Sequence, residues 1–291
     1  MTMKRPLHLL AALVVMFTGC DIVEEPYGPS NTGGGPAPVE GLRRRILLED
    51  FTGHRCIYCP EAATIAQQLE ADPAIGPDLV VVALHVTDFF AGPVPPIGDG
   101  YYDNDFRTEA GTTYTNLWLP PGSGLPKGLV NRIPYNGAMM LDRFAWDAAV
   151  NEQLGQPALM DLWFSQLERN ASTGVVNAKV KVSVAEDLAG AEHKLVVYLV
   201  EDSIVGWQSD ANASPSEIPD YVHRHVLRDD LTSAWGDVVL TGSEPVGDTL
   251  EVALPAYTLN TGWNATHLYL VAYVYNSTTY EVMQVVEKHI P

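Results

Sequence analysis

The chain has 291 residues, of which 46% are apolar, so it can bury one or two ordinary cores, and its length favours two domains. Its formal net charge of −19 excludes nucleic acid and anionic lipid as partners held by bulk electrostatics. The acidic balance mainly favours solubility.

The first residues have the pattern of a secretion signal. Lys4 and Arg5 precede an apolar core of about eleven residues, whereas a permanent membrane helix needs roughly 20. We therefore predict a cleaved signal peptide over residues 1–19. The following Cys20, preceded by small residues, resembles the lipobox of bacterial lipoproteins, which implies that Cys20 is lipidated. A plain signal peptide with an incidental cysteine is the alternative.

Residues 20–42 are expected to be a lipidated N-terminus and flexible tether. Pro, Gly, Ser and Asn dominate residues 26–41, and such a composition buries too little apolar surface to fold. The predicted contact with a membrane is thus through the lipid anchor only.

A strand, helix and strand are predicted next, over residues 45–52, 62–72 and 79–86. This order is a β-α-β unit, which implies a parallel strand pair. Residues 87–121 are rich in Gly, Pro, Tyr and Asp, and we expect them to be an insertion that forms a lid or blocks the groove. A helix is expected within residues 108–119, because an unstructured loop of this length is unusual in a compact domain.

A short strand over residues 129–132 and a helix over 142–154 complete the first predicted domain, residues 43–156. Asp142 is the expected N-cap of that helix, and Gly155 and Pro157 are its stop signals.

Residues 157–291 alternate between apolar and polar residues, with turn residues between the runs. About seven such runs favour an all-β immunoglobulin-like sandwich as the second domain. The predicted strands cover residues 159–167, 175–184, 194–200, 222–228, 249–254, 268–275 and 280–286.

The sequence Cys56-Ile57-Tyr58-Cys59 carries the candidate chemistry. With Cys20 assigned to lipid, Cys56 and Cys59 are an even pair in an oxidising compartment. Cys56 follows a buried strand and precedes a helix, where backbone N–H groups favour a thiolate. Pro60 belongs in the first helical turn, which puts Cys56 at an exposed mouth and Cys59 one turn inside. We expect Cys56 to attack and Cys59 to resolve.

Three other roles for the pair compete with this one. A structural disulfide closing about four residues stabilises by only about 2 kcal/mol, against roughly 4.7 for a hundred-residue loop, but this role stays open. A metal site of His54, Cys56 and Cys59 lacks a fourth ligand, so no metal is expected. Attachment of c-type haem needs His after the second Cys, where Pro60 stands, and no cofactor is expected.

The strand before the pair resembles the active site of thioredoxins. Asp50 stands six residues before Cys56, where thioredoxins place a buried acid that assists proton transfer. Pro126 matches their cis-proline opposite the Cys pair, and Leu125 is the residue before it. The resemblance implies an α/β thioredoxin-like first domain. Arg55 replaces the thioredoxin Trp, and the insertion lengthens the segment before Pro126.

A closer resemblance covers nearly the whole mature chain. It is to the outer-membrane-protein-twenty-eight family of Gram-negative lipoproteins, and it rests on the stretches EDFTGHRCIYCP, GLPKGLVNR, VYLVEDSIVGWQSD, YVHRHVLRDDLTSAWGD and LYLVAYVYN. The resemblance implies a thioredoxin-like domain, a C-terminal β-sandwich, and an outer-membrane location whose face stays open. Asp21, directly after Cys20, resembles both surface-export and inner-membrane retention signals, and the family resemblance favours the outer membrane.

Two smaller features have two interpretations each. His223 and His225 on one predicted strand have a spacing that could hold zinc, but without a third ligand a structural pair is favoured, and His85 is also expected to be structural. Trp207, Trp235 and Trp263 could form a binding platform or ordinary core packing, and packing is favoured.

Two functions follow from these features. The first is a lipid-anchored thiol–disulfide oxidoreductase acting on protein disulfides of the cell envelope. The second is a redox-inert binding or assembly module that engages a protein partner through the sandwich.

Overall fold

The structure, a computed structural model, describes residues 41–291 of the chain. The predicted signal peptide, Cys20 and nearly all of the 20–42 tether lie outside these residues. Among the helices of residues 41–291, none combines the length and apolar character that a bilayer span requires.

Strand β1 (Ile46–Thr52) is buried along its whole length and leads to the Cys pair. It is followed by helix α1 (Cys59–Ala71), a short 3-10 turn, η1 (Gly76–Asp78), and strand β2 (Leu79–His85). β1 and β2 pair in parallel from Ile46–Leu79 to Thr52–His85. Burial on both faces explains the nearly continuous apolar run of β2, whereas the equally buried β1 contains two acids, Glu49 and Asp50. The predicted β-α-β unit is confirmed.

Strand β3 (Lys127–Val130) lies antiparallel on the other side of β1. Helix α4 (Trp146–Gln153) packs against it, with the fully buried Trp146 ring over Gly128. A Cβ on Gly128 would lie 2.5 Å from the indole nitrogen, so this close packing requires glycine.

The helix predicted over residues 142–154 is shorter than expected. It opens with a 3-10 turn, η2 (Arg143–Ala145), and Asp142 makes no capping hydrogen bond. Its carboxylate instead accepts a hydrogen bond from Lys127 Nζ at 2.9 Å. A partner across the fold thus replaces the local cap that the sequence predicted.

The insertion at residues 87–121 contains helix α2 (Asp88–Ala91) and helix α3 (Glu109–Trp118). The helix expected within residues 108–119 is confirmed, and the Thr108 hydroxyl caps it by accepting from Gly111 N at 3.0 Å.

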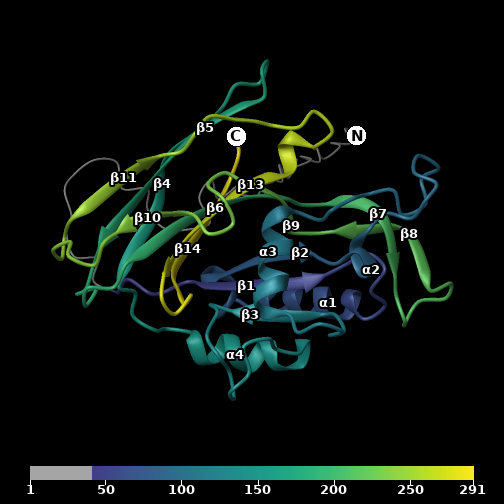
Figure 1. Cartoon of the computed structure of the whole chain (residues 1–291), viewed down its shortest axis with the longest axis horizontal. Coiled ribbons are helices and arrows are strands. Elements are labelled where there is room, and N and C mark those ends of the chain that lie inside the picture. The colour runs from purple at the N-terminus through teal and green to yellow at the C-terminus, as the bar shows by residue number, and fades with distance from the viewer. Residues whose placement is uncertain (1–40) are drawn as a thin grey trace, which may run out of the picture. The chain divides into compact units, whose positions relative to one another are not determined.

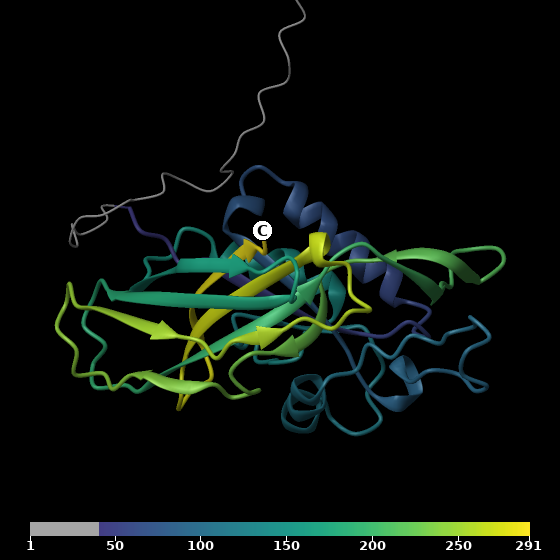
Figure 2. The same ribbon diagram turned by 90° about the horizontal axis from the view of Figure 1, so that it is seen from above.

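Alternation along β1 divides the first core into two faces. One face packs against α1 and α4, and the other against α3, so these helices lie on opposite sides of the strands, as Figure 2 shows for α1 and the insertion. The first face carries Ile46, Leu48 and Asp50, and the second carries Leu47, Glu49 and Phe51. Two neighbouring acids, Glu49 and Asp50, are therefore buried on opposite sides of one strand.

The second half supplies strands to three sheets. The small sandwich sheet contains β4 (Met160–Arg169), β5 (Val175–Val184), β11 (Thr249–Ala253) and β12 (Tyr257–Thr258). The large sheet receives β6 (His193–Glu201), β9 (Val226–Asp230), β10 (Asp237–Leu240), β13 (Leu268–Asn276) and β14 (Val282–His289), with the turn η3 (Ala265–His267) before β13. β7 (Ile204–Ser209) and β8 (Glu217–His223) form a separate hairpin.

The large sheet runs across both halves in the order β14-β13-β6-β9-β2-β1-β3, with β10 beside β6 (Figure 1). The junction is the parallel contact of Ala83 in β2 with Val226 in β9, where Ala83 N donates to His225 O at 2.7 Å. Strands of both halves thus share one sheet, and the described residues lie within one compact unit. The boundary expected at residues 155–158 falls between α4 and β4.

The fold is a mixed α/β arrangement combined with a β-sandwich, as the sequence predicted at this level. The strand predicted over residues 222–228 is wrong, because the chain reverses there. β8 ends at His223, His225 has a φ of 53°, and β9 starts at Val226 in another sheet. Alternation continues through the reversal, so the pattern does not reveal it.

Candidate active site

Cys56 and Cys59 form a disulfide with a Cα–Cα distance of 5.4 Å. Cys59 is the first residue of α1 and Pro60 lies in its first turn, so Cys59 stands at the helix start rather than one turn inside. We expected Cys56 at an exposed mouth, but the structure leaves Cys56 only 1% exposed and Cys59 2% exposed. The pair is placed at the end of β1 as predicted, yet it is covered.

The main cover is the β7–β8 hairpin, which comes from the second half of the chain. Its backbone bonds to the loop around the cysteines, with Ser209 N donating to His54 O and Ala211 N donating to Ile57 O, each at 2.8 Å. The buried Gln208 side chain adds a bond from Nε2 to Cys56 O at 3.0 Å. The insertion contributes a backbone bond from Arg55 N to Phe90 O at 2.9 Å. The side chains of His54 and Arg55 also bond to the insertion, at Gly92 O and Asp88 O.

Asp50 is buried beside Cys59 without a counterion in hydrogen-bond contact. The residue is 4% exposed, and its Oδ1 has no hydrogen-bond partner among residues 41–291. Burial raises the pKa of Asp50 to about 8, although the charge of His225 acts to lower it. At neutral pH the acid therefore mostly holds its proton.

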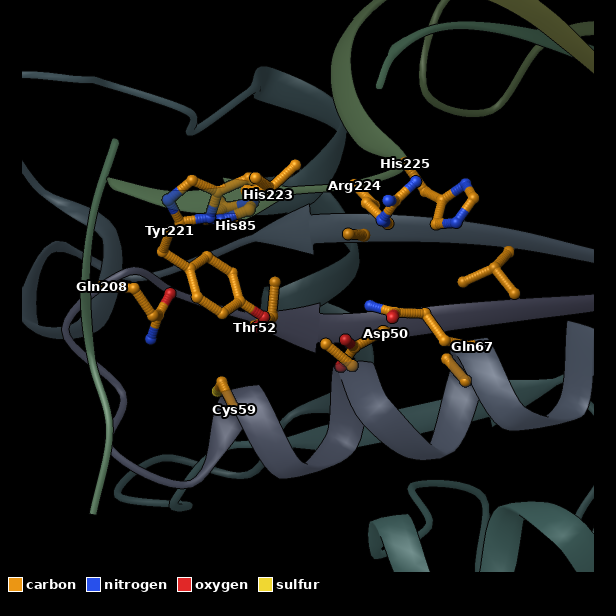
Figure 3. Close-up of a pocket in the computed structure, with 15 residues that line it drawn as sticks. Asp50, Thr52, Cys59, Gln67, His85, Gln208, Tyr221, His223, Arg224 and His225 are labelled. Atoms are coloured by element: carbon orange, nitrogen blue, oxygen red, sulfur yellow. The ribbon is translucent and has the colours of Figure 1, made fainter. Parts of the chain in front are cut away.

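A cavity of about 40 Å³ joins Asp50 to Cys59 (Figure 3). A water needs roughly 10–15 Å³ of such space, so two or three waters fit. The residues around it come from β1, α1, β2 and the β7–β8 region, and they include Asp50, Thr52, Cys59, Gln67, His85, Gln208, Tyr221, His223, Arg224 and His225. The arrangement permits proton movement between Cys59, Asp50 and water.

The histidines near the site do not form a metal centre. His85 and His223 have ring centroids 5.6 Å apart, and burial lowers the pKa of His223 to about 4 and that of His85 well below its usual value. His54 behaves alike, with burial lowering its pKa to about 4. Within the described residues, no group of three or more His, Cys, Asp or Glu side chains could hold a metal ion.

His223 and His225 do not act as a pair on one strand. The reversal between β8 and β9 sends His223 towards Trp207 O, at 3.2 Å, while His225 Nε2 lies 3.1 Å from Glu70 Oε2 on α1. The zinc interpretation of their spacing therefore fails on geometry.

Pro126 lies directly before β3. The Leu125–Pro126 peptide bond is cis, and the buried Leu125 belongs to the same apolar cluster as Cys56 and Cys59. The cis-proline loop, the end of β1 and the start of α1 thus meet in one region of the core.

The three tryptophans are dispersed. Trp207 contacts Tyr101 and Tyr102, Trp235 contacts Trp118, and Trp263 lies against Arg228. Each belongs to a different set of side chains, which agrees with packing rather than with a shared platform.

The sequence reasoning missed a buried ion pair on the other face of β1. Glu49 accepts two hydrogen bonds from Arg132, at 2.7 and 2.8 Å, and both side chains are almost completely buried. Tyr198 and Tyr273, from β6 and β13, bond to the same pair, and the Arg132 guanidinium also lies over the ring of Tyr114. An arginine directly after the strand that follows Pro126 is the one sequence signal for it.

Comparison with protein families identifies the chain over more than half of its length. The model described as "Outer membrane protein Omp28" matches residues 113–291. The chain belongs to the Omp28 family. This membership places the protein at the outer membrane. The matched residues begin after Cys59, so membership does not itself speak for the Cys pair.

One solved structure gives the fold further support. HBP35 of Porphyromonas gingivalis is similar with a TM-score of 0.63 and 17% identity, over 86% of this chain and 76% of that chain. A domain of the outer membrane lipoprotein Omp28 from Porphyromonas gingivalis is 21% identical, over 46% of this chain and 88% of that one, with a TM-score of 0.32. The comparison with curated proteins gives no match.

Proposed function

We propose that this Omp28 protein is a thiol–disulfide oxidoreductase whose first half is thioredoxin-like. Two features of the fold support the assignment. The Cys-bearing strand β1 has the parallel β2 on one side, reached through α1, and the antiparallel β3 on the other, reached through Pro126.

Asp50 is the observation that carries the proposal. A buried carboxyl group without a full set of hydrogen-bond partners costs stability. If the disulfide were purely structural, nothing would explain why such a carboxyl group lies near it. Glu49, buried on the opposite face, is paired with Arg132 through both carboxylate oxygens, which is how buried acids are usually compensated. An unpaired acid sharing a cavity with Cys59 fits a proton acceptor.

The reaction in the reducing direction has two exchanges. The Cys56 thiolate attacks a substrate disulfide, forming a Cys56–substrate bond, and the departing substrate thiolate takes a proton from water. In the fraction of molecules whose Asp50 is ionised, Cys59 then gives its proton to the Asp50 carboxylate and attacks Cys56, which forms the Cys56–Cys59 bond and releases the second substrate thiolate. The substrate gains two electrons, the protein loses two, and an external dithiol restores the protein.

Turnover of a protein disulfide tests the proposal. The reduced full-length protein should reduce insulin with dithiothreitol as the dithiol, while Cys56→Ser abolishes turnover and Asp50→Asn slows it about 10–100-fold at pH 7. Asp220→Asn, an exposed acid on β8, is the matched control. No turnover by the wild type, together with a Cys56 pKa near the free value of about 8.5, would contradict the proposal.

A second function is favoured by the burial of Cys56. A sulfur that is 1% exposed suits a redox-inert scaffold that binds a protein partner of the cell envelope through its β-sandwich. Under this function, the double variant Cys56→Ser/Cys59→Ser should fold, and cells that carry it should show the same phenotype as cells with the wild-type protein. Loss of the phenotype at unchanged abundance excludes it.

The proposed anchor is a lipid on Cys20. The expected result is that Cys20→Ser loses labelling by a fatty-acid analogue and leaves the membrane fraction, while Cys56→Ser keeps both. Labelling that persists in Cys20→Ser would reject the assignment. If Cys20 carries the lipid, residues 20–42 tether the folded part to the outer membrane.

A further inference from the structure

The cavity beside Asp50 has an outer end, and a charged pair stands there. His225 Nε2 lies 3.1 Å from Glu70 Oε2, and the two side chains are 21% and 27% exposed. Both Asp50 and His225 line the same cavity, and Asp50, at 4% exposed, is the more buried of the two (Figure 3). The cavity therefore connects a buried acid to a histidine that reaches solvent.

The other titratable groups around this cavity carry no charge near neutral pH or are already paired. Cys59 is held in the disulfide, His85 and His223 stay neutral because burial lowers each pKa, and burial raises the pKa of Tyr221 to about 12. Arg224, which is exposed, pairs with Asp202 at 3.4 Å. His225 is the remaining cation that faces Asp50.

Acidic neighbours favour the charged form of His225. Burial acts to lower the pKa of His225, but the hydrogen bond and charge of Glu70, with the charges of Glu287 and Asp202, raise it above its usual value. Glu287 is itself partly neutral, because burial raises its pKa to about 7. A cation at the cavity's outer end favours the carboxylate form of Asp50 at its inner end.

We propose that His225, supplied by the second half of the chain, is a positioning residue whose charge favours the carboxylate form of Asp50 across the shared cavity. This inference rests on the proposed function, since it concerns the acid that accepts the Cys59 proton. After each exchange Asp50 must lose that proton before it can act again. Its proton passes to water in the cavity and from there to solvent.

The backbone at His225 allows a clean substitution. Its φ of 53° lies in the left-handed region, which Asn tolerates better than most residues. His225→Asn removes the charge, and His225→Lys keeps a cation at the position. His289→Asn, a change at an exposed histidine of β14, is the matched control.

The test follows the titration of Asp50 by NMR in the oxidised full-length protein labelled with 13C-aspartate, the resonance being assigned with Asp50→Asn. In His225→Asn the midpoint should rise by about 0.5 pH units or more. His225→Lys should not raise it, and His289→Asn should leave it unchanged. An unchanged midpoint in His225→Asn overturns the inference.

A wild-type measurement keeps the inference testable where a variant does not fold. Because electrostatic coupling is reciprocal, the ring resonances of His225 should show an inflection at the Asp50 midpoint. Absence of that inflection also overturns the inference. Failure of the proposed function appears separately, as absence of insulin reduction by the wild type with the Asp50–His225 coupling intact.

Discussion

At the scale of single residues, the two neighbouring acids of β1 show how side-chain environment decides chemistry. Glu49 and Asp50 differ by one position and therefore face opposite sides of the strand. Glu49 meets Arg132 and two tyrosine hydroxyls, whereas Asp50 meets a small cavity and the Cys pair. The first acid stabilises the fold, and the second is kept protonated at neutral pH.

The raised pKa of Asp50 predicts a dependence of stability on pH. The folded state holds the proton up to about pH 8, whereas the unfolded chain releases it near 3.8, so stability from this group is present at low pH and lost as the pH rises from about 4 to 8. Asp50→Asn should remove this loss and raise the free energy of unfolding by about 3–5 kcal/mol at pH 9 relative to the wild type.

Urea unfolding at pH 5 and pH 9 measures the effect. The difference between wild type and Asp50→Asn should be small at pH 5 and large at pH 9, while Asp220→Asn should show neither change. An equal difference at both pH values would mean that Asp50 is not protonated in the folded protein.

At the scale of elements, the sequence predicts what local patterns encode and misses what distant segments supply. The β-α-β unit follows from apolar runs and helix signals, although α1 begins at Cys59 rather than at the predicted residue 62. The hairpin over the cysteines does not, because its contacts join residues about 150 positions apart through backbone atoms and one glutamine. The residue pattern of β7 and β8 does not indicate that this hairpin covers the Cys pair.

The β7–β8 hairpin therefore has to move before a protein disulfide can reach Cys56, and Gln208 is its buried side-chain link. Gln208→Ala removes the bond to Cys56 O and lowers the cost of local opening by about 1–2 kcal/mol, which corresponds to roughly 5–30-fold faster reduction of the disulfide by dithiothreitol. The rate can be followed by alkylation of freed thiols and mass spectrometry.

Gln68→Ala is the matched control, since Gln68 is an exposed residue of α1. Its rate should equal that of the wild type. Equal rates for Gln208→Ala and wild type would show that the disulfide is reduced without opening of the hairpin.

At the scale of the whole molecule, the sequence predicts an α/β half and an all-β half but not the sheet that the two halves share. Helical spacing before residue 156 and alternation after it are visible locally. The shared sheet depends on one parallel contact between Ala83 and Val226 and on side chains that meet across it. No local pattern encodes such a contact, because it joins residues more than a hundred positions apart.

The Glu49–Arg132 pair lies where the two halves meet. It links β1 and the end of β3 to Tyr198 of β6 and Tyr273 of β13, all of them buried. Removing one member of a buried ion pair leaves the other charge without compensation, which costs about 3–5 kcal/mol. The residues that bond to the pair belong to both halves, so its removal should lower the stability of both halves.

Both halves should therefore unfold in one cooperative transition. The fluorescence of the buried Trp146 in the first half and the far-UV circular dichroism of the sandwich strands should report the same transition. Arg132→Met should lower the free energy of unfolding by about 3–5 kcal/mol, and adding Glu49→Gln should restore part of this loss because the uncompensated carboxylate disappears. Lys127→Met, which breaks an exposed pair with Asp142, should cost less than about 1 kcal/mol. Two separate transitions, or additive effects of the Arg132 and Glu49 changes, would show that the halves are stabilised independently.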